Sequence, residues 1–277
     1  MKRIVEKASE VLEKIDSTLL SPVAAAADVE KLCNDALTAG FKAVVVNPVN
    51  VAACKKLLKD SLVKVCTVVG FPLGEDLTKV KLFETKRALK AGADEIDMVM
   101  CISKAKAGEW NYVGKEIKKI AKICKVKVLK VIIETCYLTE TEIKQACHTA
   151  VMNGARFVKT STGYGTAGAQ LEQVALMNDE VEQVLKDNFK QDDARCLVKA
   201  SGGIKTYEQA KAFVEAGAMR IGTSNAMEIL EESAAKGGFE KHAPAKKAVE
   251  AAGHGAENAV ESSEQDSVEV FAELDNK

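Results

Sequence analysis

Two periodicities of apolar residues alternate along the chain, one typical of a buried strand and the other of an amphipathic helix. The segment from Asp28 to Gly40 has apolar residues three or four positions apart and ends on a glycine, which predicts a helix. The run from Phe41 to Asn47 follows at once and is mostly apolar, as expected of a strand covered on both faces. Eight such strand-and-helix units predict a parallel sheet.

Eight units fit a closed (β/α)8 barrel, or TIM barrel, better than an open sheet, and 277 residues suffice for such a barrel as one domain. We therefore predict an α/β barrel domain over residues 1–233 that begins with an amphipathic helix over residues 1–14. The strands are expected at residues 15–20, 41–47, 63–71, 95–100, 126–135, 157–162, 196–201 and 219–223. The helices are expected at residues 28–40, 51–59, 79–91, 110–123, 140–153, 170–185 and 207–216, with a last one from residue 225.

The composition changes after the last predicted helix. Residues 234–277 are rich in Ala, Glu, Lys, Ser and Gly and contain few large apolar residues, so they predict a disordered C-terminal extension. The alternative is an interaction arm that binds a protein partner, with the apolar cluster from Val268 to Leu274 as its contact.

Charge and cysteine usage exclude several classes of protein. A net charge of −1 with 29% charged residues gives no electrostatic case for binding nucleic acid or an anionic membrane. Glutamates at positions 6, 10 and 13 interrupt the basic N-terminal segment, so no signal peptide is expected. The eight cysteines are scattered without a Cys-x-x-Cys pair, and Cys147 beside His148 lacks the spacing of zinc ligands. We expect a cytoplasmic protein with no metal and no cofactor.

Two lysines stand inside segments that otherwise look like buried strands. Lys159 follows Phe157 and Val158, and Lys199 occupies the same kind of position in the run from Cys196 to Gly203. A single lysine near a strand end commonly extends its ammonium group to water along an apolar stem. Two lysines in the same context favour chemistry on an amine instead, because a lysine is rarely buried without a partner or a purpose.

Strand alternation directs further polar residues into the barrel. In the fifth strand it places Lys130 and Glu134 inside, and in the fourth it places Asp97 inside. Together with Asp16 on the first strand, these residues converge with the two lysines towards the C-terminal strand ends, where barrel active sites lie. For Asp97 and Glu134, the alternative is a structural ion pair with a lysine.

Glycines follow the seventh and eighth strands. Gly202 and Gly203 precede one predicted helix, and Gly222 and Ser224 precede the last. Loops at these two places commonly bind phosphate through backbone N–H groups at a helix N-terminus. A glycine pair alone is weak evidence, since it can serve only as a turn.

The inward residues suit Schiff-base chemistry. A lysine attacks a carbonyl only as the neutral amine, so its pKa must fall from about 10.4 towards neutrality. Burial and a nearby like charge both lower the pKa of a lysine. Lys199 is the obvious candidate for the positive charge near Lys159. Asp97 is suited to relay a proton. The set predicts a metal-free aldolase that acts on a phosphorylated sugar.

At this point the sequence resembles the deoxyribose-phosphate aldolase family, from about Ile15 to Ser224. The resemblance implies a class I aldolase that reversibly cleaves 2-deoxy-D-ribose 5-phosphate to D-glyceraldehyde 3-phosphate and acetaldehyde. The matching runs are IDSTLL (15–20), VVGFPLG (68–74), GADEIDMVM (92–100), VLKVIIETCYLT (128–139), FVKTSTGYG (157–165), KASGGIKT (199–206) and GAMRIGTS (217–224).

The resemblance also implies roles for individual residues. Lys159 matches the Schiff-base lysine, Lys199 the lysine that lowers its pKa, and Asp97 the proton relay. The expected substrate and phosphate contacts are Asp16, Lys130, Thr160, Gly202, Gly203, Gly222 and Ser224. A homodimer is implied as well.

Some positions depart from the family pattern. Ser17, Ser21 and Cys101 replace residues common among relatives, and Val45 stands where a cysteine is frequent. The four tyrosines all precede the C-terminal extension, although some relatives end in a tyrosine that reaches the active site. A barrel that has become a protein-binding scaffold is therefore the alternative function.

Overall fold

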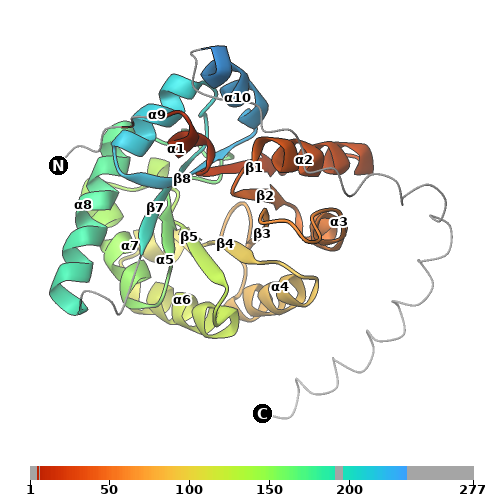
Figure 1. Cartoon of the computed structure of the whole chain (residues 1–277). Coiled ribbons are helices and arrows are strands. Elements are labelled where there is room, and N and C mark those ends of the chain that lie inside the picture. The colour runs from red at the N-terminus through yellow and green to blue at the C-terminus, as the bar shows by residue number, and fades with distance from the viewer. Residues whose placement is uncertain (1–4, 6, 191–195, 236–277) are drawn as a thin grey trace, which may run out of the picture. The chain divides into compact units, whose positions relative to one another are not determined.

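Eight parallel strands close into a barrel in the computed structural model, which describes residues 5, 7–190 and 196–235. The strand order follows the chain order, and β1 pairs with β8 to close the barrel, as Figure 1 shows. The predicted TIM barrel is confirmed. The strands are β1 (Ile15–Leu19), β2 (Ala43–Val46), β3 (Lys64–Val69), β4 (Glu95–Val99), β5 (Val128–Ile132), β6 (Phe157–Lys159), β7 (Leu197–Ser201) and β8 (Ala218–Thr223).

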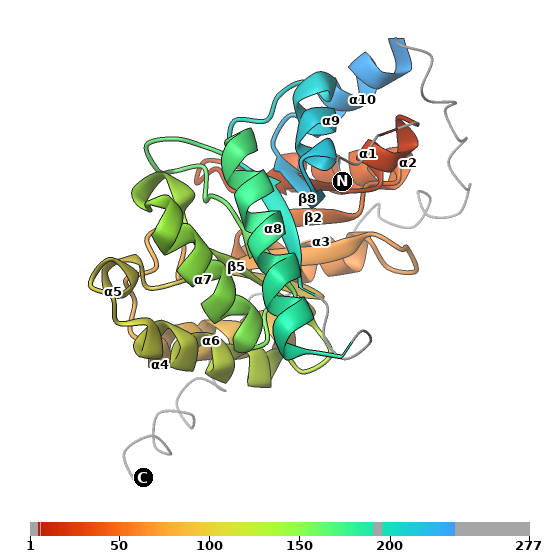
Figure 2. The ribbon, with the colours of Figure 1, turned by 90° about the vertical axis from the view of Figure 1, so that its left-hand side faces the viewer.

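The helices lie outside the strands, and the long helix α8 runs along one side of the barrel in Figure 2. They are α1 (Ser9–Leu12), α2 (Ala26–Ala39), α3 (Val51–Leu57), α4 (Thr78–Lys90), α5 (Ile102–Lys106), α6 (Trp110–Cys124), α7 (Glu140–Met152), α8 (Leu171–Asn188), α9 (Tyr207–Glu215) and α10 (Ala226–Ala235). Two short 3-10 helices, η1 (Pro48–Asn50) and η2 (Thr135–Tyr137), follow β2 and β5. None of the helices in the described ranges is long and apolar enough to span a membrane.

Local sequence sets the helix ends. Gly40 takes the left-handed conformation at the end of α2, with a φ of 68°, which a glycine adopts without steric cost. Thr139 caps α7 and Thr206 caps α9, each accepting a hydrogen bond from the backbone N–H three residues later. Because the helices begin and end at these residues, the connections between helices and strands stay short.

The main apolar core lies between the strands and the surrounding helices. Ile96 and Met98 on β4 belong to it, whereas Asp97 between them faces the barrel interior and is fully buried. A smaller apolar cluster of Val45, Cys66 and Val68 lies apart from the main core. The predicted alternation is confirmed for β4, and buried charged side chains share the barrel interior with the smaller apolar cluster.

A buried ion pair stands outside the barrel. Lys81 of α4 lies 3.0 Å from Glu116 of α6, and both side chains are 0% exposed. The Lys81 amine also donates to the carbonyl oxygens of Gly74, at 2.6 Å, and Val99, at 3.0 Å. These contacts join two helices to the loop after β3 and to the end of β4, which carries Asp97.

Several element bounds differ from the predicted ones. The N-terminal helix is one turn, Ser9–Leu12, within the described residues, and residues 1–4 and 6 lie outside them. The fifth strand ends at Ile132, because Glu134 takes a φ of 52° and turns the chain into η2. Helix α5 was not predicted, since five residues are too few to show a helical period. The disordered extension was predicted over residues 234–277, but its first two residues, 234 and 235, belong to helix α10, and residues 236–277 lie outside the described residues.

Candidate active site

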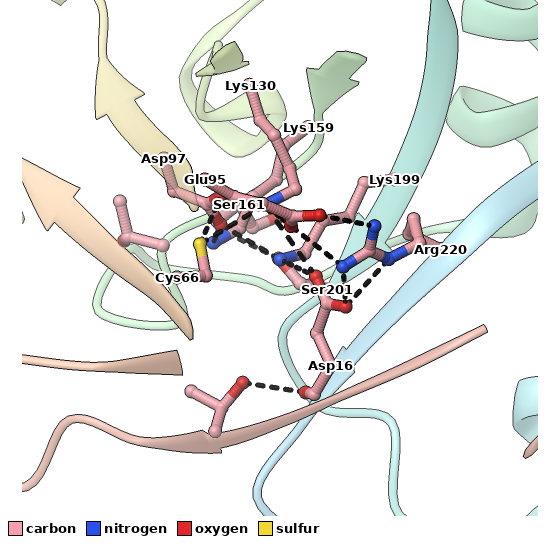
Figure 3. A network of polar contacts seen from close by, with 12 residues as sticks. Asp16, Cys66, Glu95, Asp97, Lys130, Lys159, Ser161, Lys199, Ser201 and Arg220 are labelled. Atoms are coloured by element: carbon pink, nitrogen blue, oxygen red, sulfur yellow. Dashed lines mark hydrogen bonds and ion pairs between the residues drawn. The ribbon is translucent and has the colours of Figure 1, made fainter. Parts of the chain in front are cut away.

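Three carboxylates and three cations alternate in a closed circle inside the barrel, which we call the charge ring (Figure 3). Round the circle each cation bridges the two carboxylates next to it, and a longer contact of 3.9 Å joins Lys130 to Asp16 across the circle. Each member is at most 4% exposed. In order round the circle the members are Asp97, Lys130, Glu95, Arg220, Asp16 and Lys199.

The two lysines of the charge ring both bind Asp97. Lys130 lies 2.7 Å from Asp97 Oδ1 and 2.6 Å from Glu95 Oε2, so it bridges two carboxylates of one strand. Lys199 lies 2.9 Å from Asp97 Oδ2 and 2.5 Å from Asp16 Oδ2, so it joins β4 to β1 across the interior.

Arg220 closes the charge ring on the opposite side from Asp97. Its Nε donates to Asp16 Oδ1 at 2.7 Å, and its Nη2 donates to the same oxygen. The guanidinium also donates to both Glu95 oxygens, at 3.1 and 2.8 Å. The planar fork of an arginine suits this double bridge better than a lysine would.

Lys159 is attached to the charge ring but is not a member of it. Its amine lies 2.8 Å from Asp97 Oδ2, the oxygen that Lys199 also contacts. Among the described residues, Asp97 is the one carboxylate within ion-pair distance of Lys159. Lys159 therefore shares its single carboxylate with two other lysines.

The pKa values of the four basic groups separate accordingly. Burial lowers the pKa of Lys130, Lys199 and Arg220, but their carboxylate partners outweigh burial and raise the pKa of all three above the usual range. Burial also lowers the pKa of Lys159, where the attraction of Asp97 is opposed by the charge of Lys199, and the net shift is downward. Of these four groups, Lys159 is the one whose pKa is lowered, so it loses its proton most readily.

The carboxylates of the charge ring stay ionised. Burial raises the pKa of Asp16, but Arg220, Lys199 and Lys130 outweigh it and bring the value to about 2. The pKa of Asp97 is likewise raised by burial and then carried well below its usual range by its three lysines. An aspartate with so low a pKa holds cations more readily than it stores a proton.

Strand register brings these side chains together. Asp97 pairs in register with Lys130 on β5, and Asp16 pairs with Gly222 on β8. A Cβ at Gly222 would lie 3.2 Å from Lys199 Cε and 2.8 Å from Ser201 Cβ, tighter than ordinary packing. A glycine is required there so that the Lys199 side chain can cross the interior to Asp16.

The remaining predicted contacts lie at the C-terminal strand ends but outside the charge ring. Gly202 and Gly203 follow β7 with φ of 91° and 78°, and Ser224 follows β8 with an exposed side chain. The Thr160 hydroxyl is hydrogen-bonded to the backbone of β7, since it donates to the Ser201 carbonyl and accepts from the Ser201 N–H.

Glu134 was considered as the partner of a lysine in an ion pair, but its carboxylate is hydrogen-bonded to Thr162 instead. Its carboxylate accepts from the backbone N–H of Thr162, at 3.1 and 3.3 Å, and from the Thr162 hydroxyl. Glu134 therefore ties the end of β5 to the chain just after β6. The nearby hydroxyl of Ser161 is buried without a hydrogen-bond partner.

Three members of the interior network were missed from the sequence: Glu95, Arg220 and Cys66. Glu95 stands two residues before Asp97, so strand alternation gives it the same inward direction. Arg220 stands two residues before Gly222 and could have been found in the same way. Cys66 donates to Asp97 Oδ1 at 3.1 Å, and burial, followed by the charge of Asp97, raises the pKa of its thiol.

Potential metal ligands do not gather in this part of the molecule. Within residues 5, 7–190 and 196–235, no three His, Cys, Asp or Glu side chains are placed to hold one ion. The carboxylates of the charge ring form ion pairs with lysine and arginine.

Known aldolases are similar to this chain over most of its length. The chain matches the family model described as DeoC/LacD family aldolase over residues 11–230. It is 49% identical over 222 residues to a deoxyribose-phosphate aldolase of Finegoldia magna, a match that covers 80% of this chain and 99% of the relative. It is 48% identical over 225 residues to the enzyme of that name from a Thermoanaerobacter species, covering 80% and 96% of the two chains.

A solved structure matches the same part of the chain. The deoxyribose-phosphate aldolase of Aeropyrum pernix, described as a tetramer, is 35% identical with a TM-score of 0.74, and the match covers 82% of this chain and 92% of that one. The barrel, its inward lysines and these matches lead to one assignment. The chain belongs to the DeoC/LacD family of aldolases.

Proposed function

We propose that this protein is a class I aldolase that reversibly cleaves 2-deoxy-D-ribose 5-phosphate to D-glyceraldehyde 3-phosphate and acetaldehyde, with Lys159 as the nucleophile. One observation carries the assignment to Lys159. This amine is attached to a charge ring whose own charges balance, so it is the basic group that burial leaves neutral most easily. Matches to relatives named for this activity support the choice of substrate.

The reaction follows from an amine at this position. The neutral Lys159 nitrogen attacks the aldehyde carbon, and loss of water gives an iminium ion. Loss of the proton from the C3 hydroxyl lets the C2–C3 bond break, and its electron pair moves into the iminium to give an enamine. D-Glyceraldehyde 3-phosphate leaves at this step. Protonation at C2 and hydrolysis then release acetaldehyde and restore the amine.

The neighbouring residues have separate roles in this proposal. Lys199 keeps a positive charge beside Lys159, which favours the neutral amine. Asp97 relays protons, directly or through water, and its low pKa means that it passes a proton on rather than keeping it.

Substrate contacts complete the proposed site. Asp16 and Lys130 orient the sugar from the interior, and Thr160 lies beside the nucleophile on the same strand end. The phosphate group binds at the backbone of Gly202, Gly203 and Gly222 and at Ser224, where backbone N–H groups follow β7 and β8. The glycines at 202 and 203 adopt positive φ, which brings the backbone close to a ligand.

We further propose a cytoplasmic homodimer whose catalytic domain covers residues 1–233. The described part of the chain has no membrane-spanning helix, and α10 ends at Ala235, close to the proposed boundary. The tetramer described for the Aeropyrum pernix relative is an alternative assembly that sedimentation would distinguish from a dimer.

Two measurements test the function. Purified protein is expected to release acetaldehyde from 2-deoxy-D-ribose 5-phosphate, and EDTA is expected to leave the rate unchanged. Borohydride added with acetaldehyde is expected to fix a two-carbon label on Lys159 as a secondary amine. A label on Lys130 or Lys199 with none on Lys159 would refute the assignment. A folded barrel with no turnover would instead favour the scaffold function.

A further inference from the structure

The far side of the charge ring is formed by Glu95 and Arg220, and the reaction steps above use neither residue. Both lie away from the Lys159 amine, since Asp97 is its one ion-pair partner in the described part of the chain. The Arg220 guanidinium lies 5.7 Å from the ring of Phe157, two residues before Lys159 on β6. Glu95 and Arg220 are therefore one level below the nucleophile, towards the N-terminal ends of the strands.

Each of these two residues contacts a neighbour of Asp97, the carboxylate that pairs with Lys159, or a residue one step further round the charge ring. Glu95 shares Lys130 with Asp97, at 2.6 and 2.7 Å. Arg220 shares Asp16 with Lys199, and Lys199 is the lysine that meets Lys159 on Asp97. The far side is thus connected to Asp97 in both directions round the charge ring (Figure 3).

We propose that Glu95 and Arg220 are positioning residues that set the protonation state of Lys159 through the charge ring. Three carboxylates balance three ring cations, and the fourth basic group, Lys159, is left as a neutral amine. Without Arg220, three carboxylates face two ring cations, and protonated Lys159 supplies the missing charge. Without Glu95, Asp97 is the nearest carboxylate left to Lys130, at 2.7 Å against 3.9 Å for Asp16, and the ammonium form of Lys159 becomes harder to hold.

Charged and titratable groups on the other strands surround Lys159. Most of them are charge-ring members, and the thiol of Cys66 stays protonated because burial raises its pKa. The groups are Asp16 on β1, Cys66 on β3, Glu95 and Asp97 on β4, Lys130 on β5, Lys199 on β7 and Arg220 on β8.

The test compares Glu95→Gln, Arg220→Gln and the double variant with the wild-type protein. The readout is the rate at which acetaldehyde and cyanoborohydride label Lys159 between pH 5 and 10, each rate divided by the fastest rate of the same protein. The half-maximal pH is expected to fall by about one unit in Glu95→Gln and to rise by about one unit in Arg220→Gln. One unit is a tenfold change in the ratio of neutral to protonated amine. The double variant is expected to return close to the wild-type value.

Opposite shifts of the half-maximal pH in Glu95→Gln and Arg220→Gln would show that the two residues tune Lys159. A loss of structure would instead lower the labelling rates of both variants and leave the half-maximal pH unchanged. Equal shifts, or no shift, would overturn the inference. If Arg220→Gln does not fold, Arg220→Lys keeps the charge and is expected to keep the wild-type pH profile, while Glu95→Gln still lowers it. Asp35→Asn, in the exposed Lys31–Asp35 pair, is the control and is expected to change nothing.

This inference rests on the proposed role of Lys159, and the same experiment distinguishes the two failures. A wild-type protein that carries no label on Lys159 would refute the proposed nucleophile. A wild-type protein that is labelled there, with variants whose pH profiles do not move in opposite directions, would refute the tuning role alone.

Discussion

Lys159 and Lys199 are register partners on the neighbouring parallel strands β6 and β7, and both amines contact the same oxygen of Asp97. They differ in their second contact, since Lys199 also holds Asp16 at 2.5 Å. Burial lowers the pKa of both, yet the net shift is upward for Lys199 and downward for Lys159. The number of carboxylates that a lysine contacts, rather than its burial, distinguishes Lys159 from Lys199.

Replacing the two lysines by methionine is expected to give different pH profiles. Lys159→Met removes the nucleophile, so kcat/KM is expected to fall on the order of 10⁴-fold or more at every pH. Lys199→Met removes the neighbouring charge, so kcat/KM is expected to fall roughly 10²-fold at pH 7 and to recover partly in alkaline buffer. Steady-state rates from pH 6 to 10 check this. Equal and pH-independent losses would contradict the role of Lys199.

The same two variants are expected to differ in stability. Lys199→Met leaves Asp16 and Asp97 each without one buried partner and is expected to lower the free energy of unfolding by about 3 kcal/mol. Lys159→Met is expected to raise it, because burial and the charge of Lys199 disfavour the ammonium form in the folded state.

The gain from Lys159→Met depends on pH. The folded-state pKa of Lys159 lies below its unfolded value, so the unfolded state binds more protons between the two. The loss of unfolding free energy caused by burying the Lys159 ammonium is fully present below the folded-state pKa. It shrinks as the pH rises towards the pKa of the unfolded state. Urea unfolding at pH 7 and pH 10 checks this. A gain that grew with pH would contradict the downward shift.

The ion pair between Lys81 and Glu116 is expected to be structural. Lys81→Met leaves a buried carboxylate unpaired and removes the donor to Gly74 and Val99, so the free energy of unfolding is expected to fall by about 3 kcal/mol or more. The double variant Lys81→Met/Glu116→Gln is expected to recover part of the loss. Thermal melts of the three proteins test this, with Lys31→Met on the surface as the control. No difference between Lys81→Met and the control would contradict it.

Deletion after Gly238 is expected to leave a folded and active barrel. Helix α10 ends at Ala235, and the family model matches residues 11–230. The melting temperature is expected to change by less than a few degrees, and kcat/KM by less than about threefold. Circular dichroism melts and the aldolase assay check both. A truncated protein that is insoluble, or that melts without cooperativity, would show that the extension is part of the fold.

Strand alternation explains how much of the site the sequence could predict. Which residues face inwards is a local property, so Asp97, Lys130, Lys159 and Lys199 could be directed to one interior before the register was known. The same rule applies to Glu95 and Arg220, which were missed because function was sought only at the C-terminal strand ends.

Other features depend on contacts between distant strands and could not be predicted. Which cation bridges which carboxylates is decided by side-chain rotamers and by the register of strands far apart in the sequence. Glu134 shows the same limit within one segment. Its φ of 52° ends β5 early, and its contact with Thr162 replaces the lysine partner that alternation suggested.

The pairing of Asp16 with Arg220 and Lys199 has a consequence for the order in which the protein is made. Asp16 lies on the first strand, and its partners are 183 and 204 residues later in the chain. Synthesis proceeds from the N-terminus, so this aspartate is made long before either cation exists. Any nascent chain that stops short of β8 lacks a member of the charge ring. The charge ring is therefore complete only when β8 has been made and the barrel closes, and a shorter chain cannot form it.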